Sequence, residues 1–283
     1  MGYWNRLLGA GLMVAVLAVS LTLIAPGKHD SLAANGIIYV DADATGANDG
    51  TSWADAFTTL QLALEAVSSG DQIWVAAGVY TPTAEHGGTG DRYRSFQLMN
   101  GVALYGGFDP SVGDVAFEDR DWDLHETLLS GDLNGDDGPD FANNEENSYH
   151  VFYHPEGTDL DDTAILDGFT ITGGNANAWE DFRYGGGMYN DGSSPTLRSV
   201  TFTSNSATQD GGGVYNHGDS SPVLTNCTFM GNSATIGGGM SNAPDCAPKL
   251  TDCSFVGNAA HNGGGMFNYY SAPTLTNCTF EGN

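Results

Sequence analysis

The acidic stretch GDLNGDDGPD, at residues 131–140, comes closest in this sequence to a known ligand-binding pattern. Aspartate and asparagine alternate along it, as the oxygen ligands of D-x-N-x-D-G calcium loops do. Position six is Asp137, where such loops have glycine, and the closing glutamate is missing from its usual place, although Glu145 is nearby. The stretch predicts either a Ca²⁺ site or a solvated acidic turn. Its candidate ligands are Asp132, Asn134, Asp136, Asp137 and Asp140.

Aromatic side chains form a second candidate site. Tyr189, Tyr215 and Phe267 each follow an apolar position of a repeat, and Ser241 interrupts the series. Neighbouring residues of a strand point to opposite faces, so an inward-facing Met188 would leave Tyr189 on the outside. An outward aromatic ladder can stack on sugar rings, or it can simply stabilise neighbouring strands. The three aromatic residues are therefore candidates for ligand binding, with a structural role as the alternative.

Groups for acid–base catalysis do not converge along the sequence. Arg183 and Arg198 are the only arginines in the regular repeats, and nothing in the sequence places carboxylates beside them. His150 and His154 flank the strand-like VFY, where we expect structural roles. We therefore assign no catalytic residue from the sequence.

The four cysteines show neither CxxC nor Cys/His spacing, so they do not predict a zinc site. Cys227, Cys253 and Cys278 share one position of the repeat, where stacked strands would bring their Cα atoms within bridging distance. We favour a buried column of reduced thiols, because three cysteines cannot pair completely and free cysteine packs as a small apolar side chain. Cys246 lies outside this column.

These residues belong to a repeat of about 26 residues that is marked by glycine triplets. The triplets read GGGMYN from Gly185, GGGVYN from Gly211, GGGMSN from Gly237 and GGGMFN from Gly263. A second module follows each one, as in SPTLRSVTFTSNSA and SPVLTNCTFMGNSA. A catalytic site occurs once, whereas a feature present in every repeat is best explained by stacking. The triplets also lack the Lys-Ser or Lys-Thr of a phosphate-binding loop, so we interpret them as scaffold.

Each repeat holds three short apolar patches, and none is long enough for a helix. Three brief strands cannot bury a hydrophobic core by themselves, but successive coils stacked roughly 4.8 Å apart form a continuous one. The pattern therefore predicts a parallel β-helix. Inward columns are expected at Met188, Val214, Met240 and Met266, at Leu197, Leu224, Leu250 and Leu275, and at Phe202, Phe229, Phe255 and Phe280. Asparagine ladders are expected at Asn190, Asn216, Asn242 and Asn268, and at Asn205, Asn232, Asn258 and Asn283.

The units GGGMYN, SPTL and CTFxGNSA resemble those of secreted bacterial right-handed parallel β-helix proteins of the pectin-lyase-like superfamily. The glycine and F-x-x-N elements are also similar to repeats of chlamydial polymorphic outer membrane proteins. YVDADATGANDGTSWADAF and NGVALYGGFDP extend the resemblance over nearly all of the chain after residue 34. It implies an all-β, right-handed parallel β-helix but little about function, because the superfamily includes lyases, hydrolases and adhesins. The hydrolase pattern of paired aspartates with Gly-His-Gly and Arg-x-Lys is not present.

The chain divides into an export segment and one expected domain. An apolar run after Arg6 predicts a signal peptide or an N-terminal anchor over residues 1–34. The amphipathic stretch 56–67 predicts a helix that caps the first coil, because an open coil would expose core side chains and strand edges. Asn283 falls in mid-coil, so we expect further coils beyond it. Within the domain at 35–283 we expect a cap and first coils at 35–108, acidic insertions at 109–163, and regular repeats at 164–283.

Charge limits the partners. The chain has eight Lys and Arg against 35 Asp and Glu, a net charge of −27, which disfavours nucleic acid and anionic polysaccharides. We expect an exported structural or adhesive solenoid at the cell surface that binds a surface glycan or protein, with membrane contact only through a terminal anchor. The alternative is a polysaccharide lyase or glycoside hydrolase with its site in the irregular coils at 109–190.

Overall fold

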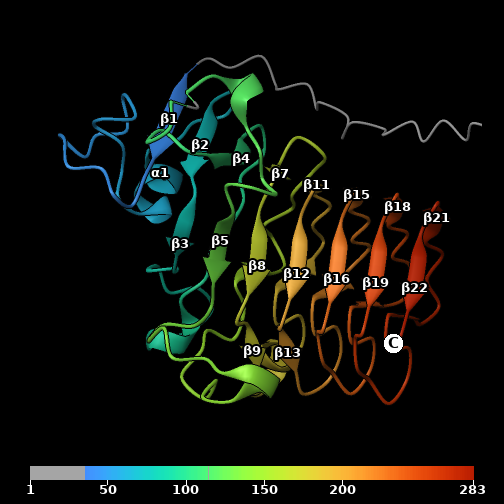
Figure 1. Cartoon of the computed structure of the whole chain (residues 1–283). Helices are drawn as coiled ribbons and strands as arrows, with labels where there is room; N and C mark the ends of the chain where they lie inside the picture. The colour runs from blue at the N-terminus through green and yellow to red at the C-terminus, as the bar shows by residue number, and fades with distance from the viewer. Residues whose placement is uncertain (1–35, 114) are drawn as a thin grey trace, which may run out of the picture. The chain divides into compact units, whose positions relative to one another are not determined.

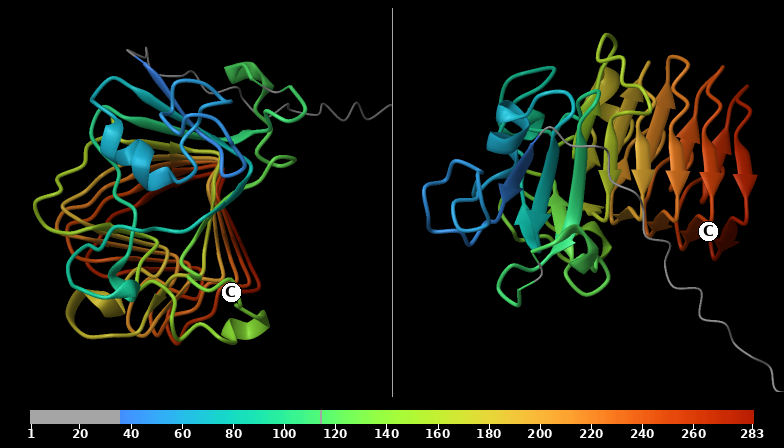
Figure 2. Two further views of the ribbon diagram at one scale, coloured as in Figure 1. Left: turned by 90° about the vertical axis from the view of Figure 1, so that its left-hand side faces the viewer. Right: turned by 90° about the horizontal axis from the view of Figure 1, so that it is seen from above.

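The computed structural model describes residues 36–113 and 115–283, over which short strands wind around a common axis (Figure 1). The regular coils superimpose when viewed along this axis (Figure 2), and their strands pair in parallel from one coil to the next. The predicted signal peptide or anchor at 1–34 lies outside the described residues. Among the residues that the structure describes, no helix is long and apolar enough to cross a membrane.

Three parallel sheets run along the solenoid. Sheet A contains β1 (Ile37–Val40), β2 (Gln72–Ala76), β4 (Ala103–Phe108), β7 (Ile165–Asp167), β11 (Thr196–Arg198), β15 (Val223–Thr225), β18 (Lys249–Thr251) and β21 (Thr274–Thr276). Sheet B contains β3 (Gly78–Tyr80), β5 (Thr127–Ser130), β8 (Thr170–Thr172), β12 (Thr201–Thr203), β16 (Thr228–Met230), β19 (Ser254–Val256) and β22 (Thr279–Glu281). Sheet C contains β6 (Phe152–His154), β10 (Met188–Asp191), β14 (Val214–His217), β17 (Met240–Asn242) and β20 (Met266–Asn268). A two-residue pair, β9 (Asn175–Ala176) and β13 (Ser206–Ala207), lies between sheets B and C in chain order.

The predicted apolar columns fill the interior. Phe202 and Phe229 stack with ring centroids 5.0 Å apart and an interplanar angle of 6°, and the next two pairs of the column stack at 4.6 Å. Each such pair adds about 1 kcal/mol beyond the burial of its area. Cys227 and Cys253 are both 1% exposed and lie in the same core as predicted, whereas Cys278 of the same column is only partly buried against it. The other two columns keep the predicted register: Met188, Val214, Met240 and Met266, and Leu197, Leu224, Leu250 and Leu275.

Both asparagine ladders are confirmed. In the first, the Nδ2 of each asparagine donates to the Oδ1 of the next at 2.8–3.0 Å, beginning with Asn190 and Asn216. In the second, Asn232 Oδ1 accepts from both the backbone N–H and the Nδ2 of Asn205, and Asn232 Nδ2 donates to Phe202 O. The buried amides of the second ladder thus satisfy backbone groups of the neighbouring coil, as buried polar groups in folded proteins require.

Two glycines of each triplet have different reasons to be glycine. Gly185 has φ +59°, and its counterparts in the next three repeats have nearly the same angle, which disfavours residues with a side chain. Gly187 instead needs space, because a Cβ there would lie 2.6 Å from Gly213 O of the next coil and 3.0 Å from Phe202. The scaffold interpretation of the triplets is therefore confirmed.

The predicted capping helix is present but shorter than the amphipathic stretch. The helix α1 spans Leu60–Ala66 and lies at the β1 end of the solenoid, where Leu60, Ala63 and Leu64 are buried. The residues before it stay extended because Phe57 exchanges backbone hydrogen bonds with the first strand, accepting from Asp41 and donating to Tyr39. Short 3₁₀ turns interrupt the connections at η1 (Asp91–Tyr93), η2 (Phe117–Asp119), η3 (Pro139–Phe141) and η4 (Glu180–Arg183).

Candidate functional site

A depression of about 250 Å³ lies at the corner where sheet A turns into sheet B, and we call it the corner groove. It brings together three stretches that are distant in sequence: the loop before β5, the β7–β8 corner and the β11–β12 corner. Its surface offers one indole ring, two carboxylates and several hydroxyl groups. The lining residues are Trp122, Asp123, Glu126, Gly168, Phe169, Thr170, Ser199 and Thr201.

A buried ion pair supports the groove from below. Arg120 Nη2 lies 2.9 Å from Asp167 Oδ1, and the two side chains are only 4% and 0% exposed. Arg120 Nε also donates to Gly106 O at 2.8 Å, and the guanidinium lies 5.4 Å from the ring of Trp122. Gly168 has φ +81°, and a Cβ there would lie 2.7 Å from Arg120 Nη2, so glycine leaves room for the buried guanidinium at this position. These contacts hold the indole in place from the protein side.

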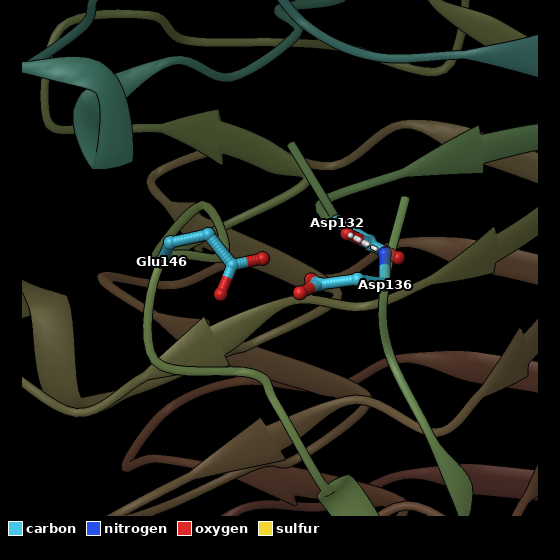
Figure 3. A group of neighbouring side chains, drawn as sticks. All are labelled: Asp132, Asp136 and Glu146. Carbon is cyan, nitrogen blue, oxygen red and sulfur yellow. Dashed lines mark hydrogen bonds between the residues drawn. The ribbon is translucent and has the colours of Figure 1, made fainter. Parts of the chain in front are cut away.

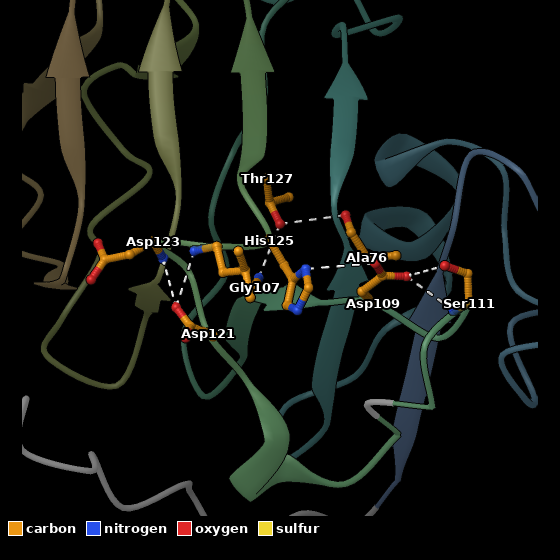
Figure 4. Close-up of polar contacts among 9 residues, drawn as sticks. Ala76, Gly107, Asp109, Ser111, Asp121, Asp123, His125 and Thr127 are labelled. Carbon is orange, nitrogen blue, oxygen red and sulfur yellow. Dashed lines mark hydrogen bonds and ion pairs between the residues drawn. The ribbon is translucent and has the colours of Figure 1, made fainter.

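Local hydrogen bonds orient the acidic groups beside the groove, and Figure 4 shows those that Asp121 accepts. Thr170 Oγ1 donates to Glu126 Oε1 at 2.8 Å, which ties the loop to β8. Asp121 Oδ1 accepts from the backbone N–H groups of Asp123 and Leu124 at 3.2 and 3.0 Å, so the acidic loop has a defined turn.

A histidine and an aspartate meet next to this loop (Figure 4). His125 Nδ1 lies 3.5 Å from Asp109 Oδ2, while Ser111 Oγ donates to Asp109 Oδ1 at 2.6 Å. The Ser111 hydroxyl, helped by His125, lowers the pKa of Asp109. Both partners contact the same carboxylate, so this is not the serine–histidine–aspartate arrangement of a nucleophile with its base.

The acidic stretch folds so that three carboxylates converge (Figure 3). Asp132, Asp136 and Glu146 each place an oxygen within 4.8 Å of the others. Asp132 organises the turn, because its carboxylate accepts the backbone N–H groups of Gly135 and Asp137 at 2.6 and 3.1 Å. We call these three residues the carboxylate cluster.

The cluster fits a hard divalent cation such as Ca²⁺, which prefers carboxylate oxygens. Glu146 Oε1 is buried without a hydrogen-bond partner, which is costly for a carboxylate unless a cation lies close. Beside it, burial raises the pKa of Asp137 to about 6, and the charges of Asp132, Glu146 and Asp136 add to the rise against a hydrogen bond from Asn147. A bound cation would offset this crowding of negative charge.

The sequence assigned the cluster only in part. Asp132 and Asp136 are brought together, whereas the third carboxylate comes from Glu146 and not from the neighbouring Glu145. Asp140 is exposed, lies in η3 with φ +57° and is not among the three carboxylates, while Asn134 is exposed on the same turn and stays a candidate ligand. The chain folds back before β6, and this return places Glu146 beside Asp132.

The expectation of a solvent-exposed tyrosine ladder is wrong. Tyr189 and Tyr215 are adjacent in register and point outward from β10 and β14, but they are only 2% and 8% exposed. The segment 177–184, which contains η4, covers them: Tyr184 stacks on Tyr215 with ring centroids 4.7 Å apart. A sugar ring therefore cannot stack on either tyrosine, while Phe267 on β20 is partly exposed.

An insertion explains the covered tyrosines. Gly174 and Asn205 are equivalent positions, since Asn175 pairs with Ser206. The triplet at Gly185 begins eleven positions after Gly174, whereas the triplet at Gly211 begins six positions after Asn205. The coil that contains Gly174 therefore has five extra residues before its triplet. Sequence reasoning missed the cover because this coil lies before the first clean repeat.

The two histidines have structural positions, as expected. His150 and His154 are fully buried, and burial lowers the pKa of each to about 4. His150 Nδ1 contacts Gly185 O at 3.0 Å, and His154 bridges Asn190 and the backbone N–H of Leu98. Neither lies among the residues that line the corner groove or form the carboxylate cluster.

Comparison with known proteins identifies the family. The family described as "Right handed beta helix region" matches residues 141–283, half of the chain. The chain belongs to this family. The expected right-handed parallel β-helix is thereby confirmed, and no curated protein matches the sequence.

Two solved structures resemble the right-handed β-helix of this chain. One is the pectate lyase Pel9A, at 14% identity and a TM-score of 0.44, with 82% of this chain and 55% of that chain covered. The other is a rhamnogalacturonan lyase, at 13% identity and a TM-score of 0.43, with 87% of this chain and 62% of that chain covered. The chain thus spans less than two thirds of either structure, and similarity at this level carries no activity over to it.

Proposed function

We propose that this right-handed β-helix is an exported surface module that binds a glycan, with the corner groove as its docking site. The observation that carries the proposal is the lining of the groove, where the indole of Trp122 meets carboxylates and hydroxyls. Aromatic rings stack on the apolar faces of sugars, and the polar side chains supply hydrogen-bond partners for sugar hydroxyls. A protein that docks at the same surface is the alternative partner.

A glycan array, screened with and without calcium, tests this proposal. Each glycan that binds is then titrated into the wild type and into the variants Trp122→Ala and Trp179→Ala. Trp179 is 83% exposed and lies outside the groove, so it serves as the matched tryptophan control. We expect Trp122→Ala to weaken binding about tenfold, as the loss of one aromatic stacking contact would, and Trp179→Ala to leave it unchanged. Binding that survives in Trp122→Ala would place the ligand elsewhere.

The carboxylate cluster favours a second candidate, a calcium-dependent polysaccharide lyase, because three converging carboxylates can hold the metal that such chemistry uses. A lyase also needs a base. Burial lowers the pKa of Arg92, and the nearby charge of Glu146 opposes this shift. The guanidinium donates to Asn147 O and Asn175 O and lies over the Tyr149 ring. It is therefore engaged in holding the loop.

A product assay separates the two candidates. Each glycan that binds is incubated with the protein and calcium, and unsaturated or reducing ends are measured. Binding without turnover supports the binding module. Turnover that Asp136→Asn abolishes would support the enzyme.

A further inference from the structure

We infer that the corner groove selects a cationic glycan, a polysaccharide whose sugars carry free amino groups. This inference rests on the proposed function and names its substrate class. It sets the chain apart from proteins that take uronate polymers, whose carboxylates carry the opposite charge.

The charge of the groove carries the argument. Asp123 and Glu126 are exposed carboxylates in its lining, and none of the eight lining residues is basic. Arg120 lies directly beneath, but it is buried and paired with Asp167, so it contributes no net positive charge to the surface. Fixed charges act over a Debye length of about 8 Å in physiological salt, which spans a groove of this size. Asp123 and Glu126 therefore attract an ammonium group and repel a uronate carboxylate.

The acidic groups are also held in place. Thr170 holds one oxygen of Glu126, and Asp121 caps the turn that carries Asp123. An ammonium group donates three hydrogen bonds, and ordered carboxylates accept them with less loss of side-chain freedom than mobile ones. The two ordered carboxylates can therefore bind a primary amine through hydrogen bonds, in addition to repelling anionic sugars.

The remaining lining favours a sugar chain over a basic peptide. Trp122 is half-buried, with the Arg120 guanidinium 5.4 Å from its ring, and this contact anchors the indole as a platform. Thr170, Ser199 and Thr201 place hydroxyls around it. A basic peptide would use the carboxylates but has no general need of a stacking ring and several hydroxyls, whereas a sugar ring uses both.

Calorimetric titration with matched oligosaccharides tests the inference under mildly acidic conditions that keep sugar amines protonated. The four probes are glucosamine oligomers, their N-acetylated counterparts, cello-oligosaccharides and oligogalacturonates. We expect the glucosamine oligomers to bind about tenfold more tightly than the N-acetylated ones, as two partly screened ion pairs would give. The preference should shrink as salt rises, since the Debye length falls to about 3 Å at 1 M.

Variants locate the effect. Asp123→Asn with Glu126→Gln should abolish the preference for the amine while weaker binding of the neutral oligomer persists. The control changes the same net charge at two exposed acids outside the groove, Glu156→Gln with Asp245→Asn, and should retain the preference. Trp122→Ala should weaken both ligands.

Several outcomes would overturn the inference. Equal or tighter binding of the N-acetylated, neutral or uronate oligomer refutes the amino-sugar preference but leaves a glycan-binding module intact. No binding of any glycan, here or on the array, removes the proposed function as well. Oligolysine that binds as tightly as the glucosamine oligomer, with no effect of Trp122→Ala, would identify a basic peptide as the ligand.

Discussion

His154 Nδ1 lies 2.8 Å from Asn190 Oδ1, so a histidine stands at the head of an asparagine ladder. Asn190 Nδ2 already donates to Asn216, which leaves its Oδ1 as the acceptor and requires a proton on His154 Nδ1. The other ring nitrogen, Nε2, accepts the backbone N–H of Leu98 at 3.1 Å. The neutral ring therefore uses both nitrogens, and a second proton, on Nε2, would remove the acceptor of the Leu98 N–H.

Acid should therefore destabilise the fold through His154. Its pKa falls from 6.5 to about 4 on folding, chiefly through burial, so the unfolded chain takes up the proton first. The stabilisation is complete above pH 6.5 and is lost as the pH falls through 4, on the order of 3 kcal/mol. Melting temperatures measured between pH 7.5 and 4 should show this loss.

The variant His154→Asn tests whether the loss of stability in acid comes from His154. It should be less stable than the wild type at pH 7.5, since Leu98 loses its acceptor, but should lose less stability on acidification. His261→Asn, at an exposed histidine, is the control and should behave as the wild type. An unchanged acid slope in His154→Asn would contradict the assignment.

Asn232→Ala should cost on the order of 3 kcal/mol. Asn232 is fully buried, and its removal leaves Phe202 O and the N–H of Asn205 without partners. Asn226→Gly is the control, because Asn226 is exposed with φ +55° and its Nδ2 donates only to Ser199. This change should cost less than about 1 kcal/mol. Thermal melts that rank the two variants equally would refute a stabilising role for the ladder.

Calcium should raise the melting temperature, and EDTA should reverse the rise. Binding at 100 times the dissociation constant stabilises a fold by about 2.7 kcal/mol. Asp136→Asn and Glu146→Gln should abolish the shift, because each removes one carboxylate of the cluster. Asp140→Asn, exposed and outside the cluster, should keep it. A full calcium shift in Asp136→Asn, or no shift in the wild type, would leave the cluster as an acidic turn.

Thiol labelling should follow position in the column. Cys227 is 1% exposed and burial raises the pKa of its thiol well above the usual value, whereas Cys278 is partly exposed and burial raises the pKa of its thiol less. Iodoacetamide reacts with the thiolate, so native protein should be labelled at Cys278 well before Cys227. Peptide mapping measures the order, and all four cysteines should react in urea. A Cys227–Cys253 disulfide peptide would contradict the reduced column.

Part of the candidate site could be anticipated from the sequence. The D-x-N-x-D pattern identified Asp132 and Asp136, because ligands close in sequence share one turn. Glu146 and the corner groove were not found. Trp122, Thr170 and Ser199 come from three different coils, and no local spacing relates them. The sequence held one signal of this corner: Ser199 aligns with Gly168, Asn226, Asp252 and Asn277, and Gly, Asn and Asp are residue types that tolerate a positive φ. All five residues have a positive φ in the structure.

The sequence by itself determined the β-helix, its inward columns and its asparagine ladders. Stacking repeats a single coil, so a constant period places equivalent residues one above another and strand alternation assigns their faces. The tertiary structure alone decided which outward residues meet solvent. Tyr189 faces outward in its strand yet is buried, because the non-repeating segment 177–184 packs over it. Such insertions follow long-range packing and not the repeat, and they shape the surface on which function depends.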